Sequence, residues 1–219
     1  MLTMDQQRVS RRLGRPPVEE VAEGERRQHI VRAARDLFGQ HGYAAVSLSD
    51  IAERVGVTKA ALYHHFRTKD ELYAEMMVDI LDSVTGAVRA VVEGPGSTES
   101  RLRELVARAV VHIPREIDRD SMMRDVDDRL PPVQRRAVHE AHDRYLETLH
   151  DLVRQGIECG ELRSEFDSRL LVHMLVGILD HFTGLAGAKT GLPAARRTAE
   201  AISDVFLLGV RARPEGPEV

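Results

Sequence analysis

Apolar residues recur at intervals of three and four along most of this chain, and clusters of Pro and Gly separate the runs. This spacing places apolar side chains along one face of an α-helix, whereas a half-buried strand needs strict alternation. The pattern therefore predicts an all-α protein. We expect helices over residues 25–40, 47–55, 58–66, 70–92, 99–113, 120–129, 132–158, 168–188 and 194–211.

Polar capping residues mark three helix starts between residues 47 and 71. Ser47-Leu-Ser-Asp50 and Thr68-Lys-Asp-Glu71 have the form of capping boxes, in which a hydroxyl accepts a hydrogen bond from an early backbone N–H. Thr58 is a third N-cap, Gly56 supplies the turn before it, and Gly42 predicts a left-handed end to the first helix. Two short helices joined by a glycine turn predict a helix-turn-helix unit.

The short helix after Gly56 carries functional side chains on its outer face. Leu62 and Phe66 are spaced to point into a core. The other face combines polar groups with a small residue that allows close approach, and it holds Lys59, Ala60, Tyr63 and His64. In a helix-turn-helix unit this face enters the major groove of DNA. A solvated rim in an all-α protein that binds no DNA is the competing interpretation.

Residues 47–72, SLSDIAERVGVTKAALYHHFRTKDEL, resemble the signature of TetR-family transcriptional regulators. The resemblance extends back through the first helix and its end at Phe38-Gly-Gln-His-Gly-Tyr43. It implies a homodimer in which each subunit sets residues 58–66 into one DNA half-site. The positions that it assigns to DNA contact are Ser47, Thr58, Lys59, Ala60, Tyr63, His64 and Lys69. The recognition helix has no Arg, Asn or Gln, so we expect specificity to depend partly on DNA shape.

The resemblance and the positions of the Pro and Gly clusters divide the chain into four predicted parts. We expect a flexible basic arm at residues 1–22, a helix-turn-helix DNA-binding domain at 23–69, a helical ligand-binding and dimerisation domain at 70–212, and a tail at 213–219. The net charge of −4 argues against a protein coated in nucleic acid, but residues 1–75 carry 12 Lys and Arg against 11 Asp and Glu. The positive excess therefore lies at the N-terminal end.

The arm itself is a candidate for a second DNA contact. Its four arginines from Arg8 to Arg15 have no acidic residue among them. Gly14-Arg15-Pro16 resembles the centre of an AT-hook, whose arginines lie in a narrow minor groove. Arg15 is therefore a candidate DNA-binding residue, and a solvated basic tail is the alternative.

In the resembling family, helices after the DNA-binding part enclose a ligand pocket, and the last two pair with their copies in the dimer. Broad apolar surfaces on the last two predicted helices fit such an interface, although they also fit a monomer core. The candidate interface residues are Leu171, Met174, Gly177, Ile178, His181, Ile202, Phe206 and Val210. The candidate pocket residues, mostly apolar as hydrophobic ligands require, are Met76, Ile80, Val84, His112, Met122, Met123, Val126, Tyr145, Leu149, Phe166, His173 and Phe182.

Histidine spacing offers an alternative effector. His139, His142 and Asp143 lie close on one predicted helix, while His173, Asp180 and His181 lie about two turns apart on another, so a metal could bridge the two. Neither group completes a known metal-binding motif.

Other functional classes receive less support from the sequence. We find no nucleophile elbow, phosphate loop or His-Glu-x-x-His motif, and the single Cys159 has no evident base partner, so we expect no enzyme and no bound cofactor. The absence of a long apolar run predicts a soluble, cytoplasmic protein that does not enter a membrane. A protein-interaction module would leave the basic arm and the Tyr63/His64 face unexplained.

The leading prediction is a ligand-responsive repressor. Its homodimer would bind a near-palindromic operator of double-stranded DNA and would be released by a hydrophobic or amphipathic small molecule. A metal-responsive regulator and a transcriptional activator remain alternatives from the sequence.

Overall fold

The computed structural model describes residues 18–112, 119–187 and 192–212. These residues form nine helices, and their only β-type pairing is an isolated bridge between Leu162 and Arg211. The all-α prediction is confirmed. The helices are α1 (Val18–Ala45), α2 (Leu48–Val55), α3 (Lys59–His65), α4 (Lys69–Val92), α5 (Thr98–His112), α6 (Arg119–Arg129), α7 (Pro132–Glu158), α8 (Ser168–Gly187) and α9 (Leu192–Val210).

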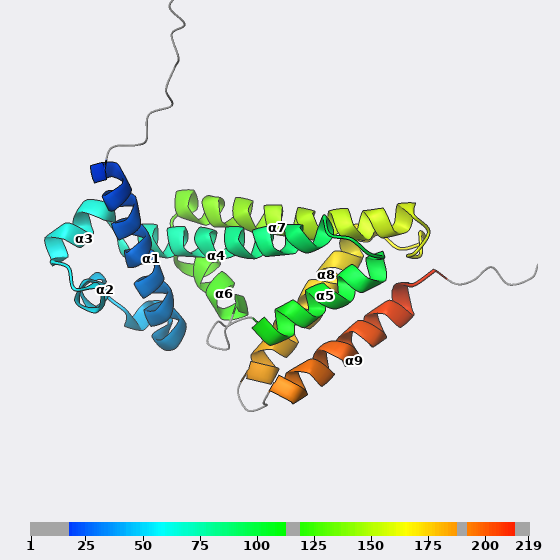
Figure 1. Cartoon of the computed structure of the whole chain (residues 1–219). Coiled ribbons are helices and arrows are strands. Elements are labelled where there is room, and N and C mark those ends of the chain that lie inside the picture. Colours follow the sequence, from blue (N-terminus) through cyan, green and yellow to red (C-terminus); the bar gives the residue numbers. More distant parts are fainter. Residues whose placement is uncertain (1–17, 113–118, 188–191, 213–219) are drawn as a thin grey trace, which may run out of the picture.

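The helices divide between two ends of an elongated molecule (Figure 1). Helices α1, α2 and α3 form one end, and the long helices α4 and α7 run side by side from this end toward the other. Helices α5, α8 and α9 make the far end, where α5 lies alongside α9, and α6 lies near α1. Helix α4 therefore connects the two ends directly.

Local sequence signals explain the α2–α3 unit. Ser47 caps α2 through a full capping box with Asp50, and Thr58 caps α3 by accepting a hydrogen bond from the Ala61 N–H at 3.2 Å. Gly56 ends α2 in the left-handed conformation, with φ 77° and ψ 29°, which L side chains rarely adopt. The predicted helix-turn-helix geometry is present.

Two predicted details differ from the structure. Gly42 has the expected positive φ of 76°, but its ψ of 162° is extended, so it interrupts α1 without forming a left-handed helical cap. Helix α1 also begins at Val18, directly after Pro16-Pro17, although we expected the arm to reach residue 22 and the helix to begin near residue 25.

The buried side chains form two clusters. The first joins α1, α2 and α3 to the beginning of α4, to α6 and to the beginning of α7. The second joins the end of α4 and most of α7 to α5, α8 and α9. The packing of α1, α2 and α3 is therefore continuous with α6 and α7, across the predicted boundary at residue 69. No helix in the described ranges has the length and apolar character needed to cross a bilayer.

Candidate nucleic-acid interface

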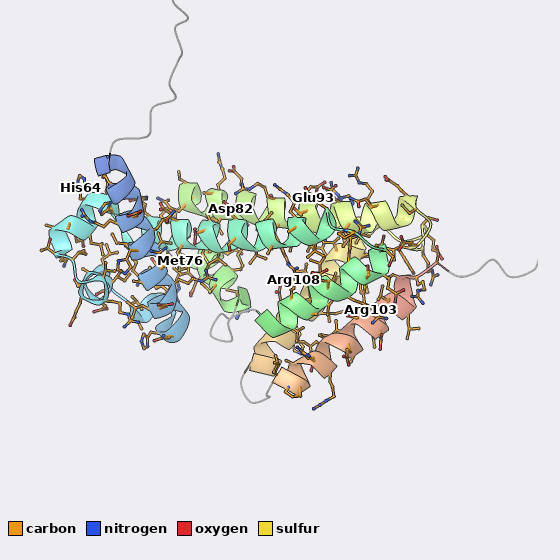
Figure 2. The ribbon with its side chains drawn as sticks, viewed as in Figure 1. His64, Met76, Asp82, Glu93, Arg103 and Arg108 are labelled. Atoms are coloured by element: carbon orange, nitrogen blue, oxygen red, sulfur yellow. The ribbon has the colours of Figure 1, made fainter. Side chains whose placement is uncertain are left out.

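The outer side of α3 presents a continuous set of exposed residues. Leu62 and Phe66 are fully buried, which turns Lys59, Ala60, Tyr63 and His64 outward together with the N-cap Thr58. We call these five outward residues the α3 face. The Tyr63 side chain is 43% exposed, and the Lys59 ammonium lies 5.8 Å from the centre of its ring. Figure 2 shows His64 at the α3 end of the molecule.

His65 points the other way. It is one of the few buried polar residues, and burial lowers the pKa of its imidazole. Its neutral ring therefore belongs to the support of α3, while the adjacent His64 belongs to the exposed face.

Ser47 lies at the start of α2, and its hydroxyl is already engaged. The hydroxyl donates to an Asp50 carboxylate oxygen at 2.9 Å, and the Ser47 backbone N–H donates to the same oxygen at 2.8 Å. This backbone hydrogen bond is the main cause that lowers the pKa of Asp50. A phosphate at Ser47 would compete with an ionised carboxylate for the same donors.

Lys69 differs from the free point charge expected at the start of α4. Its ammonium lies 4.1 Å from the centre of the Tyr43 ring, and partial burial lowers its pKa. A lysine stem packs readily on aromatic surface while its charged end stays near the ring face. Tyr43 also stacks on Phe38 and donates a hydrogen bond to Asp70. Lys69 would have to swing away from this cluster to reach a phosphate.

Arg27 is a positioning residue that no sequence pattern indicated. It donates through Nε to Glu75 Oε1 at 2.7 Å and through Nη1 to the His65 carbonyl oxygen at 2.6 Å. Its guanidinium also lies 4.1 Å from the centre of the Phe66 ring. One side chain from α1 therefore holds the C-terminal end of α3 against α4.

A second contact reaches the α3 face from α1. The Glu23 carboxylate lies 3.6 Å from His64 Nε2, and both side chains are mostly exposed. Exposed pairs contribute little to stability. The pair nevertheless places a negative charge beside a candidate DNA contact.

The candidate pocket residues fall into several groups. Met76, Ile80, Met122 and Val126 are buried together in the first core cluster, with Met123 packed against it. Tyr145 and Leu149 belong to the second cluster, against which Val84 and Phe166 pack. His173 and Phe182 lie on the exposed side of α8 and do not join either buried group. The opposite side of this helix is the one that faces the core, and it carries Leu171, Val172, Leu175 and Leu179. The side chain of His112 and all of Arg15 lie outside the described residues.

The candidate dimer residues divide into two groups. Leu171, Ile202, Phe206 and Val210 are between 3% and 6% exposed and pack in the chain's own second cluster. Their side chains belong to the core of the chain itself. Met174, Gly177 and His181 are exposed and Ile178 is partly exposed. The exposed apolar residues of the same two helices also include Leu170, Phe182, Val205 and Leu208, which the sequence interpretation did not assign to the interface.

The metal alternative loses its geometric basis. The described residues contain no group of three or more His, Cys, Asp or Glu side chains arranged to hold a metal ion. His139 instead contacts Asp127 at 2.8 Å, and His173 contacts the Arg169 carbonyl oxygen at the same distance.

Family models match both ends of the molecule. Residues 30–76 match the model for bacterial regulatory proteins of the tetR family, and residues 100–202 match the tetracyclin repressor-like C-terminal domain. The chain belongs to the TetR family. As a TetR-family chain, it has the fold of DNA-binding transcriptional regulators.

Individual relatives of this TetR-family protein are distant. The repressor KstR2 of Mycobacterium tuberculosis H37Rv is 26% identical over 151 residues, which cover 68% of this chain and 76% of KstR2. A regulator from Saccharomonospora viridis solved with choline has a TM-score of 0.72 at 23% identity, covering 87% of this chain and 100% of that one. FadR of Bacillus subtilis, solved with stearoyl-CoA, has a TM-score of 0.68 at 18% identity, covering 83% and 98%. At these identities the two structures establish the fold alone.

Proposed function

We propose that this protein is a ligand-responsive transcriptional repressor that binds a near-palindromic operator as a homodimer. The observation that carries the proposal is the α3 face, a row of outward side chains on a helix that Arg27 fixes at its far end. The backbone N–H groups at the α3 start favour a phosphate, and Tyr63 can donate a hydrogen bond to another. The relative KstR2 is a transcriptional repressor, which supports repression over activation as the function of this protein.

Release by a hydrophobic or amphipathic molecule would act through α6. Helix α6 contacts both α4 and α1. The Met122 carbonyl oxygen accepts a hydrogen bond from the Tyr73 hydroxyl of α4 at 3.4 Å, and the Arg129 guanidinium lies 5.9 Å from the centre of the Tyr43 ring of α1. A ligand that separates Met122 and Val126 from Met76 and Ile80 would therefore disturb the packing under α1 and α4. Such coupling requires the ligand to bind the DNA-free geometry more tightly.

A fragment screen tests the proposal. Purified protein would be bound to genomic DNA fragments at two salt concentrations, and the tightest fragment would be footprinted. We expect a protected near-palindrome whose half-sites are about 34–36 Å apart, because two recognition helices enter successive major grooves. Affinity should fall as salt rises, since phosphate contacts release counterions. Binding no tighter than to bulk DNA at both salts would contradict the proposal.

Two substitutions on the α3 face should have different effects. Tyr63→Phe removes one phosphate donor and is expected to weaken binding roughly fivefold on cognate and scrambled duplexes alike. Lys59→Ala is expected to change the preference among operator variants, because Lys59 lies where the helix start meets base edges. Fluorescence anisotropy on both duplexes would measure this. Equal losses on cognate and scrambled DNA for both variants would refute the division of roles.

A further inference from the structure

A groove of about 560 Å³ lies between α5 and α9. The two helices are antiparallel. Arg103 pairs with Asp204 at 2.8 Å, and Glu99, one turn earlier on α5, pairs with Arg211 just after the end of α9. Figure 2 shows Arg103 and Arg108 on α5, where it runs beside α9. The groove uses the side of α9 that faces α5, whereas Val205 and Leu208 project from α9 into solvent.

The floor of the groove is apolar. Ala107 and Ala199 leave room between the helices, and Leu192 at the rim is 50% exposed. Ser203 also lines the groove, but its hydroxyl proton is donated to the Ala199 carbonyl oxygen at 2.8 Å. The volume lies within the range of small-molecule sites, and the floor would exclude water from an apolar chain or ring laid along it.

The walls of the groove carry more positive than negative charge. Three arginines and two glutamates line it. Arg108 pairs at 2.5 Å with Glu104 on its own helix, whereas Arg196 makes no hydrogen bond or ion pair with any described residue. Glu200, one turn after Arg196, is the one acidic side chain on the α9 wall. A guanidinium without a partner beside apolar surface suits a carboxylate or phosphate, which it binds through two parallel hydrogen bonds.

We infer that this groove is a binding site for an amphipathic anion. The apolar part would lie on Ala107, Ala199 and Leu192. The anionic head would bind Arg196, and it would also bind Arg108 by displacing Glu104 from that arginine. Arg103 is held by Asp204 and Glu99 and closes one end. The groove is separate from the α4–α6 contacts invoked for operator release, and anion binding in it does not depend on the proposed function.

Calorimetry on the full-length protein without DNA tests the site. Octanoate, octyl phosphate and uncharged octanol would be titrated separately, which also separates a carboxylate head from a phosphate head. We expect at least one anion to bind tenfold or more tightly than octanol. Arg196→Ala and Arg108→Ala are each expected to lower the affinity for that anion about tenfold. Glu200→Gln is expected to raise the affinity for the anion, because the substitution removes a negative charge that repels it.

Arg197→Ala is the matched control, because this exposed arginine is the next residue on α9 but does not line the groove. Its anion affinity should equal that of the unaltered chain. Equal affinities for octanol and the anions, or an Arg196→Ala variant that binds the anion as well as Arg197→Ala does, would overturn the inference. Operator affinity of the ligand-free protein is measured separately, so failure of DNA binding would count against the proposed function and not against the groove.

Discussion

Replacing Val205 and Leu208 by glutamate is expected to yield a monomer that binds operator DNA about 100-fold more weakly or worse. The two side chains are 71% and 82% exposed on α9, in a protein whose proposed function requires two recognition helices. Burying each in a partner would contribute about 1.5–3 kcal/mol, and a two-fold interface contains every residue twice. Four buried carboxylates would abolish that gain. In the dimer, one subunit bound to its half-site holds the other at a high effective concentration near the second half-site. A monomer loses this second contact, so its affinity for the operator falls.

Sedimentation equilibrium would give the oligomeric state, and anisotropy would give the operator affinity. Val133→Glu is the control, because Val133 is 77% exposed on α7 and belongs to a different helix from the proposed interface. It should leave both measurements unchanged. Circular dichroism should show the same helix content in all variants, since none of these side chains lies in the core. If the double variant still sediments as a dimer, the dimer interface does not include Val205 and Leu208 and lies on another surface.

Arg27→Ala is expected to lower the free energy of unfolding by about 1–2 kcal/mol and to weaken DNA binding at least tenfold. The side chains of Arg27 and Glu75 are 35% and 34% exposed, so solvent screening reduces the cost below the 3–5 kcal/mol of a fully buried pair. The substitution also removes the donor to the His65 carbonyl oxygen and the cation above Phe66. Binding is expected to suffer as well as stability because the end of α3 loses its attachment to α1.

Urea denaturation and operator titration would measure both effects. Arg26→Ala is the control, because the neighbouring Arg26 is exposed on α1. A double-mutant cycle of Arg27→Ala with Glu75→Gln isolates the coupling between the two side chains. Additive losses would show that Arg27 does not act through Glu75, and normal DNA binding by Arg27→Ala would remove it as a positioning residue.

Much of the candidate site could be predicted from the sequence because its signals are local. Ser47, Thr58, Gly56 and the spacing of Leu62 and Phe66 act within one or two helical turns, and they determined where α2 and α3 begin and which side of α3 faces outward. The helix bounds agree with the predicted ranges to within two residues except at both ends of α1, which spans Val18–Ala45 where residues 25–40 were expected. Capping and periodicity depend on neighbours in the chain, so no tertiary knowledge was needed.

The faces of α8 and α9 show where sequence pattern is insufficient. Both helices carry apolar residues around much of their circumference, so the pattern could not separate the core side from an exposed side. Packing against α5 and α7 decided that Leu171, Ile202, Phe206 and Val210 turn inward. The same packing leaves Leu170, Val205 and Leu208 exposed and forms the groove beside Arg196.

The sequence by itself therefore determined the all-α fold, the helix-turn-helix unit and the outward residues of α3. Only the tertiary structure decided how that helix is held and which surfaces remain available for partners. Arg27 and Glu75 are 48 residues apart, and Tyr43 meets Lys69 and Arg129 from three different helices. Contacts between distant segments follow from how whole helices pack, and short-range periodicity contains no information about that packing.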